Sequence, residues 1–288
     1  VHSSLYSKTR EEFLENLFKV APKKLSQVHL NNSGSEAIEA GMKFARKFTG
    51  KTEMVAMNGS YHGKTLGALS ITFNPKYRKA FKPLVEKVSF SPFGDIEKLR
   101  ETVNDQTAFV ILEPIQGESG IHVAPDGFLQ DVRKLCDEKG ILLIFDEIQA
   151  GLGRTGKMWA HQHWDTAPDI LCLAKGIAGG VPMGATLVKP DILDCISKGE
   201  HSSTFGGNPL SCAAGTATIQ ALTQDKLVEN SENMGKLFRQ GLDELKEKHS
   251  VIREVRGKGL MIGIELKFEV RDILMEGIEK GLLLLYSG

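Results

Sequence analysis

Two short apolar runs near the middle of the chain constrain its fold most strongly, because each has the length and content of a buried strand. The runs span residues 141–145 and 170–174, and neither contains a charged side chain. The first run ends directly before Asp146 and the second ends directly before Lys175. Such runs are typical of parallel strands that are covered on both faces. We therefore predict that Asp146 and Lys175 emerge at the carboxyl ends of two strands, where open α/β sheets bind their ligands.

Strand and helix patterns alternate over residues 1–222, which predicts an α/β fold with a mostly parallel central sheet covered by helices. The other segments with a strand pattern are residues 53–57, 109–112 and 185–188. The segments with helical spacing are residues 11–20, 35–48, 128–136 and 210–222. We predict that residues 1–222 form one large domain.

From residue 223 the pattern indicates the start of a smaller α+β domain, which we assign to residues 223–288. Its expected helices are residues 226–248 and 270–280, and its expected strands are residues 251–256 and 260–266. The first helix carries six apolar residues that we expect to face inward, namely Leu227, Met234, Leu237, Phe238, Leu242 and Leu245. The apolar run 282–286 has the length of a strand.

The composition argues against several kinds of partner. The chain has 36 Lys and Arg residues and 36 Asp and Glu residues, so its formal net charge is zero. A neutral chain gives no electrostatic reason to expect nucleic acid or an anionic membrane as a partner, and no apolar run reaches the length of a membrane span. The four cysteines have neither Cys-x-x-Cys spacing nor a His at ligand spacing, which predicts reduced thiols and no metal site.

The pair Asp146 and Lys175 also indicates a chemistry. A buried carboxylate can hold a protonated pyridine nitrogen, and a lysine can form a Schiff base with an aldehyde. These are the two groups that a pyridoxal phosphate enzyme most requires from its protein. The separation of 175 − 146 = 29 residues suits one crossover between parallel strands. Taken singly, each residue has an ordinary alternative, since an Asp can cap a turn and a strand-end Lys is commonly exposed.

Two other segments carry groups that suit a phosphorylated, ring-shaped ligand. Ser33 and Glu36 have the spacing of a capping box at the start of a predicted helix. Gly34 between them allows a ligand to approach the backbone, and a helix start offers N–H groups to a phosphate. Tyr61 lies in a loop after a strand, where an aromatic ring can stack on a flat cofactor. A plain helix cap and a surface loop are the alternatives.

Six segments, in their order along the chain, resemble the class III pyridoxal phosphate-dependent aminotransferases of fold type I. The segments are SGSEA, YHGKT, EPIQGESG, DEIQ with GLGRTGK, LAKGIAGG and STFGGNP, and they extend over most of the chain. Within the family, the chain is most similar to the acetylornithine and acetyl-lysine aminotransferases of arginine and lysine biosynthesis. Family members are longer at both ends, so the resemblance implies that the chain is a fragment.

The resemblance implies roles for four residues around the ring of pyridoxal 5′-phosphate. Lys175 would form the Schiff base and later move the proton between the substrate carbon and the cofactor. Asp146 would pair with the pyridinium nitrogen, so that the ring can withdraw electrons. Tyr61 would stack on the ring, and Gln149 would contact the ring hydroxyl.

The resemblance also implies a phosphate site and a site that two subunits share. Gly34 and Ser35 would give backbone N–H groups to the phosphate. Thr204 would reach across a homodimer interface to the phosphate of the partner, and Ser203 would reach the substrate of the partner.

Two residues are expected at the substrate. Lys64 stands where the family usually has an Arg that binds the substrate carboxylate with two parallel hydrogen bonds, and a lysine ammonium cannot reproduce that geometry. Glu118 matches an acid that in relatives pairs with an Arg near the substrate carboxylate.

The implied function is transfer of the terminal amino group of N-acetylornithine, or of a similar N-blocked diamino acid, to 2-oxoglutarate by a cytoplasmic homodimer. Ornithine or 4-aminobutyrate aminotransferase is the alternative within the family. An aminomutase or racemase on the same fold is the alternative of another reaction class, and it would not require 2-oxoglutarate. A non-catalytic relic that only binds the cofactor is the third alternative.

Overall fold

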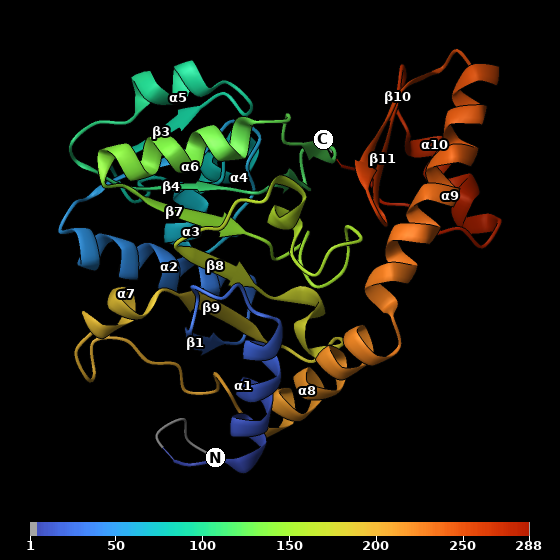
Figure 1. Ribbon diagram of the computed structural model, residues 1–288. Coiled ribbons are helices and arrows are strands. Elements are labelled where there is room, and N and C mark those ends of the chain that lie inside the picture. Colours follow the sequence, from blue (N-terminus) through green and yellow to red (C-terminus); the bar gives the residue numbers. More distant parts are fainter. Residues whose placement is uncertain (1–4, 288) are drawn as a thin grey trace.

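A seven-stranded sheet organises the computed structural model, which describes residues 5–287 (Figure 1). The strand order is β1-β9-β8-β7-β4-β2-β3. The strands are β1 (Gln27–Asn31), β2 (Glu53–Met57), β3 (Val88–Ser91), β4 (Thr107–Leu112), β7 (Leu142–Asp146), β8 (Ile170–Leu173) and β9 (Gly184–Val188). β2, β3, β4, β7 and β8 pair in parallel, whereas β9 runs antiparallel to both β8 and β1. The predicted α/β fold with a mostly parallel sheet is therefore confirmed. Two short strands, β5 (Ile115–Gln116) and β6 (His122–Val123), form a separate hairpin.

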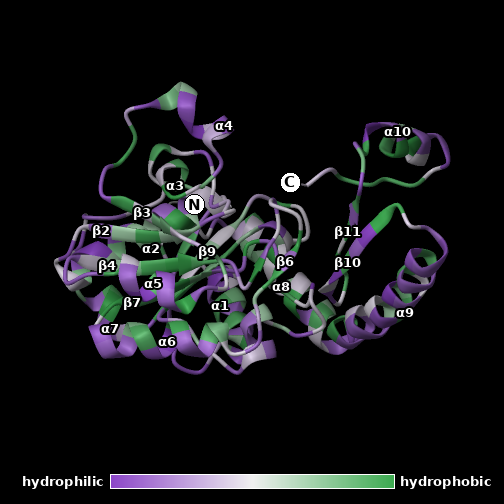
Figure 2. Cartoon of the chain, turned by 90° about the horizontal axis from the view of Figure 1, so that it is seen from above, coloured by the Kyte–Doolittle hydropathy of each residue, from purple (hydrophilic) through white to green (hydrophobic). Residues whose placement is uncertain are grey.

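Helices cover both faces of this sheet, because alternate residues of the central strands point to opposite faces. In β7, Leu143 and Phe145 belong to one buried cluster, whereas Leu142 and Ile144 belong to the other. The first cluster packs against α1 (Lys8–Val20), α5 (Ile96–Thr102), α6 (Phe128–Lys139) and α8 (Pro209–Gln224). The second packs against α2 (Gly34–Thr49), α3 (Leu66–Ser70) and α7 (Pro190–Asp194), while α4 (Pro75–Arg78) lies near α3. Figure 2 shows the hydrophobic strands between these layers of helices.

A smaller unit follows α8 and lies to one side of the sheet (Figure 1). It contains α9 (Leu227–Lys248), the antiparallel strands β10 (Ile252–Lys258) and β11 (Met261–Leu266), and α10 (Arg271–Glu279). The division of the chain at residue 222 stays a prediction.

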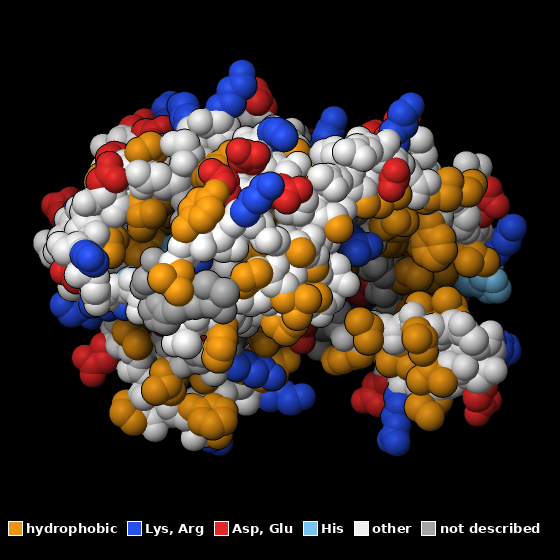
Figure 3. Space-filling model, turned by 90° about the horizontal axis from the view of Figure 1, so that it is seen from below, with side chains coloured by type: hydrophobic (Ala, Val, Ile, Leu, Met, Phe, Trp, Pro, Cys, Tyr) orange, Lys and Arg blue, Asp and Glu red, His pale blue; other side chains and the backbone are white. Residues whose placement is uncertain are grey.

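The prediction that six apolar residues of α9 face a core is wrong for all but one of them. Leu242 is 8% exposed, whereas Leu237 is 64% and Phe238 is 56% exposed. A two-stranded sheet is too narrow to cover a helix of 22 residues. Figure 3 shows the resulting apolar side chains gathered on this side of the molecule (right).

The run 282–286 does not form a strand. Leu285 is 95% exposed and Leu283 is 81% exposed, and the segment pairs with no strand of the described residues. Apolar content alone does not make a strand, because a strand also requires a hydrogen-bonded neighbour.

No helix within residues 5–287 combines the length and the apolar character needed to cross a bilayer. All four cysteines are free thiols, and burial raises the pKa of Cys136 to about 12.

Asp169, directly before β8, contacts residues of three other segments, which are α6, β7 and the residue after β9. Its carboxylate accepts hydrogen bonds from Arg133 Nη1 at 2.8 Å and from the Leu143 N–H at 2.8 Å, and it also pairs with Lys189. Burial raises the pKa of Asp169, but the Arg133 ion pair and these hydrogen bonds outweigh burial and hold the pKa below its usual value.

Because the pKa of Asp169 is lower in the folded than in the unfolded state, its contribution to stability is present above the unfolded pKa. This contribution is lost as the pH falls through the folded pKa. Asp169→Asn is expected to lower the free energy of unfolding by about 3 kcal/mol at neutral pH and to flatten its acid dependence. Urea unfolding measures both effects. Asp137→Asn is the matched control, since Asp137 is an exposed partner of the same Arg133 and its loss changes stability by less than about 1 kcal/mol. Equal losses of unfolding free energy in the two variants would contradict the stabilising role of the buried Asp169 carboxylate.

Candidate active site

Four parallel strands bring their carboxyl ends to the same edge of the sheet, and the predicted site lies there. Asp146 is the last residue of β7, and Lys175 follows β8. The loop with Tyr61 follows β2, and Glu113 follows β4. A cavity of about 380 Å³ opens at this edge, which is the usual size of a small-molecule site.

Seven of the ten residues that the sequence predicts for the site line this cavity. They are Gly34, Ser35, Tyr61, Glu118, Asp146, Gln149 and Lys175. The structure therefore brings together residues that are up to 141 positions apart, since 175 − 34 = 141.

The other three predicted residues, Lys64, Ser203 and Thr204, are not among the residues that line the cavity. Ser203 Oγ accepts hydrogen bonds from Asn32 Nδ2 at 3.2 Å and from the Gly206 N–H at 3.0 Å. Thr204 is exposed. The hydroxyls of Ser203 and Thr204 therefore do not line the cavity of their own chain.

Asp146 is only 4% exposed, and both of its carboxylate oxygens are held by the protein. Oδ1 accepts a hydrogen bond from the Ile148 N–H at 3.0 Å, and Oδ2 lies 2.8 Å from His62 Nδ1. A carboxylate oxygen can accept more than one hydrogen bond, so Asp146 keeps accepting capacity toward the cavity.

His62 and Glu113 also line the cavity, although neither was predicted as a site residue. Glu113 accepts hydrogen bonds from the N–H groups of Tyr61 at 2.9 Å and Gly117 at 3.0 Å. Burial raises the pKa of Glu113 to about 7, while the nearby His62 lowers it and Asp146 raises it. The one available signal was the position of His62 beside Tyr61, and this position does not indicate that the imidazole is buried.

The start of α2 offers free N–H groups to the cavity. Ser33 Oγ accepts from the Glu36 N–H at 3.2 Å, as the capping-box prediction requires. The Glu36 carboxylate, however, accepts from the Asn32 N–H at 2.9 Å, one residue earlier than in a standard capping box. The N–H groups of Gly34 and Ser35 donate to none of the described residues. They can therefore bind a phosphate at the positive end of the helix dipole.

Close packing explains two of the glycines at the cavity. A Cβ at Gly34 would lie 2.9 Å from Ile148 Cδ1, and one at Gly117 would lie 1.4 Å from Gln149 Oε1. Gln149 is therefore packed directly against the Gly117 backbone.

Lys175 has a left-handed backbone with φ of 44°, which is uncommon for a residue that is not glycine. Its side chain lines the cavity and makes no hydrogen bond or ion pair with any described residue. Strained backbone concentrates at functional sites. The geometry leaves the amino group free to react with a ligand.

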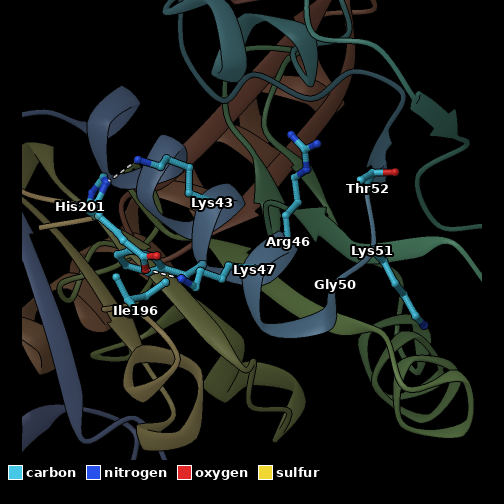
Figure 4. Close-up of a pocket in the computed structure, with 10 residues that line it drawn as sticks. Lys43, Arg46, Lys47, Gly50, Lys51, Thr52, Ile196 and His201 are labelled. Atoms are coloured by element: carbon cyan, nitrogen blue, oxygen red, sulfur yellow. Dashed lines mark hydrogen bonds and ion pairs between the residues drawn. The ribbon is translucent and has the colours of Figure 1, made fainter. Parts of the chain in front are cut away.

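A second cavity, of about 340 Å³, lies beside the carboxyl end of α2 and is lined by several basic side chains (Figure 4). These side chains do not converge on one point. Lys43 Nζ lies 2.9 Å from His201 Nδ1, and Lys47 pairs with Glu200. Arg46 and Lys51 point away from these pairs in Figure 4. The divergence argues against an anion site at this place.

Comparisons with known proteins agree with the fold. The family model of class-III aminotransferases matches residues 1–288. The acetylornithine aminotransferase of Methanopyrus kandleri is 47% identical over 261 residues, which are 91% of this chain and 66% of that protein. A LysW-aminoadipate semialdehyde/glutamate semialdehyde transaminase of Sulfolobus acidocaldarius is 43% identical over 286 residues, which are 99% of this chain and 74% of that protein.

A solved structure of the ornithine aminotransferase from Toxoplasma gondii, with pyridoxal phosphate at partial occupancy in its active site, has the same fold. It superposes with a TM-score of 0.95 at 32% identity, over 100% of this chain and 70% of that one. The chain belongs to the class-III aminotransferase family. It spans about two thirds of the length of the curated relatives it matches.

The family uses pyridoxal 5′-phosphate, so the prediction of this cofactor is confirmed. The residues present also fit it. The cavity places the Lys175 amino group, the buried carboxylate of Asp146 and two free N–H groups around the space for a ring with a phosphate. The Ile148 side chain, which packs against Gly34, adds an apolar surface for the ring.

Proposed function

We propose that the protein containing this chain transfers the terminal amino group of N-acetylornithine, or of a similar N-blocked diamino acid, to 2-oxoglutarate. The observation that carries the proposal is that Lys175, Asp146 and the start of α2 all line the same cavity. The names of the relatives from Methanopyrus kandleri and Sulfolobus acidocaldarius support the donor class and a role in arginine or lysine biosynthesis.

Each lining residue has a role that follows from its position. The pyridoxal phosphate ring supplies an electron sink. The Lys175 amino group would anchor the cofactor aldehyde and then move the proton at the substrate carbon. The buried Asp146 carboxylate would accept from the ring nitrogen and keep it protonated. The N–H groups of Gly34 and Ser35 would hold the phosphate, and Tyr61 would cover one face of the ring.

The substrate carboxylate is proposed to bind beside Tyr77, which contacts Tyr61 and Glu118 of the cavity lining. Lys64 Nζ lies 4.6 Å from the centre of the Tyr77 ring, and the Tyr77 hydroxyl lies 3.4 Å from Glu118 Oε1. The Tyr77 ring also packs edge-on against the Tyr61 ring, with 5.7 Å between the two ring centres. The Tyr77 ring therefore places the Lys64 ammonium close to the residue that covers the cofactor.

Lys64→Arg is expected to lower the KM for N-acetylornithine about tenfold, because a guanidinium binds a carboxylate with two parallel hydrogen bonds. The kcat is expected to change less than about twofold, since the gain is in ground-state binding. Steady-state kinetics with each donor measure both constants. Lys79→Arg, on an exposed lysine after α4, is the matched control. An unchanged KM in Lys64→Arg would exclude Lys64 from carboxylate binding.

A cytoplasmic homodimer with shared active sites is also part of the proposal. Its support is that Ser203 and Thr204 do not line the cavity of their own chain, so they are free to serve that of a second copy. Sedimentation of the full-length protein tests the oligomeric state.

Turnover with defined amino donors tests the reaction. The full-length protein is expected to use N-acetylornithine or an equivalent N-blocked donor in preference to free ornithine and to 4-aminobutyrate. Activity is expected to depend on 2-oxoglutarate. Product formation without any 2-oxoglutarate would support an aminomutase or racemase instead, and a preference for free ornithine would support ornithine aminotransferase.

A further inference from the structure

His62 lines the cavity with a buried side chain, and none of the roles above uses it. Its side chain is 0% exposed and its Nδ1 lies 2.8 Å from Asp146 Oδ2. Its other ring nitrogen, Nε2, is buried and has no hydrogen-bond partner among the described residues. Glu113 is close enough to His62 and Asp146 for their charges to influence it.

The contacts determine which nitrogen of His62 carries the proton. The Asp146 carboxylate can only accept, so the 2.8 Å contact requires a proton on Nδ1. His62 therefore donates from Nδ1 to Asp146.

The backbone around His62 is fixed without help from a ligand. The His62 N–H donates to Thr72 Oγ1 at 3.0 Å, and the Thr72 hydroxyl lies 3.1 Å from the Gly63 carbonyl oxygen. A Cβ at Gly63 would lie 2.2 Å from Ser35 Oγ, so the loop packs closely on the start of α2. The imidazole thus reaches Asp146 from a rigid support.

We propose that His62 is a positioning residue for the cofactor: through its Nδ1–H it fixes the Asp146 carboxylate and directs it at the ring nitrogen. The inference rests on the proposed function, because it assumes that a pyridine nitrogen binds at Asp146. Without His62, Oδ2 loses its only hydrogen bond to a described residue. The Asp146 carboxylate is then fixed by one donor instead of two, so it is less well oriented to pair with a ring N–H.

Two substitutions separate this role from simple packing. His62→Asn retains a donor near the position of Nδ1, whereas His62→Leu has a similar volume and no donor. Two readouts that require no turnover are measured on the full-length protein. One is the dissociation constant of pyridoxal phosphate, and the other is the pH dependence of the visible absorbance of the lysine-bound cofactor.

His62→Leu is expected to weaken cofactor binding about tenfold, as expected for the loss of a hydrogen bond to a charged group. His62→Leu is also expected to shift the absorbance transition to higher pH. A ring nitrogen that has lost its proton carries no positive charge, so it no longer disfavours a proton on the Schiff-base nitrogen. His62→Asn is expected to remain close to the wild type in both readouts. Wild-type values in His62→Leu, or equal changes in the two variants, would overturn the proposal.

A third measurement covers the case in which His62→Leu does not fold. Nitrogen-15 NMR of histidine-labelled, cofactor-free wild-type protein is expected to show a proton on Nδ1 of His62, and a proton on Nε2 alone would overturn the proposal. None of these readouts depends on an amino donor. If the protein binds the cofactor but transfers no amino group, the proposed function fails while the role of His62 is still decided.

Discussion

Lys175→Ala is expected to lower kcat/KM for amino transfer by at least about 10⁴-fold, because the variant loses both the covalent anchor of the cofactor and the group that moves the proton. Among the described residues, Lys175 is the one lysine that lines the cavity, so no neighbouring amine can replace it. Steady-state kinetics with N-acetylornithine and 2-oxoglutarate measure the loss. The visible absorbance of the lysine-bound cofactor is expected to disappear in the same variant.

Lys134→Ala is the matched control for this prediction, since Lys134 is exposed on α6 and does not line the cavity. Its activity and absorbance are expected to equal those of the wild type. Retention of turnover in Lys175→Ala would show that Lys175 is not the catalytic lysine, and it would contradict the aminotransferase, aminomutase and racemase hypotheses together, because all three rest on it.

Asp146→Asn is expected to lower kcat/KM by about 10³-fold, the usual scale for the loss of one preorganised electrostatic contact. An asparagine side chain has one acceptor oxygen and one amide donor group. Its oxygen can replace only one of the two carboxylate oxygens that now accept from Ile148 and His62. The amide group then donates toward the ring nitrogen, which favours the ring without a proton and weakens its ability to withdraw electrons.

The kinetic loss in Asp146→Asn is expected to appear in the proton-transfer step, which a deuterium label at the reacting carbon of the donor reports. Asp131→Asn, at an exposed position of α6, is the control and is expected to leave the rate unchanged. A loss confined to KM would mean that Asp146 serves binding alone, and this result would contradict its role at the ring nitrogen.

The central part of the fold was predictable because its sequence signals are local and strong. The runs before Asp146 and Lys175 became β7 and β8, and residues 53–57 became β2 with the same bounds. Apolar runs of this length can be buried only inside a covered sheet. The antiparallel direction of β9 was not predictable, because strand direction depends on the connection after Lys175 and on pairing with β1.

The order of the motifs along the chain predicted seven of the residues that line the cavity, but it did not predict the buried polar network beside Asp146. His62 and Glu113 form that network only because the ends of β2, β4 and β7 lie side by side. The prediction that one face of α9 is buried was wrong for a related reason. A helix of suitable periodicity is buried only where enough structure lies opposite it, as the exposed Phe238 demonstrates.

Reductive trapping tests the central claim most directly, because it identifies the lysine that bonds to the cofactor. Borohydride adds hydride to the carbon–nitrogen double bond between the cofactor and its lysine and makes the link permanent. Peptide mass spectrometry of the trapped full-length protein then locates the added mass. The account predicts that the pyridoxyl group is on Lys175, in the peptide that follows β8. A label on another lysine, or no label on a protein that binds the cofactor, would contradict it.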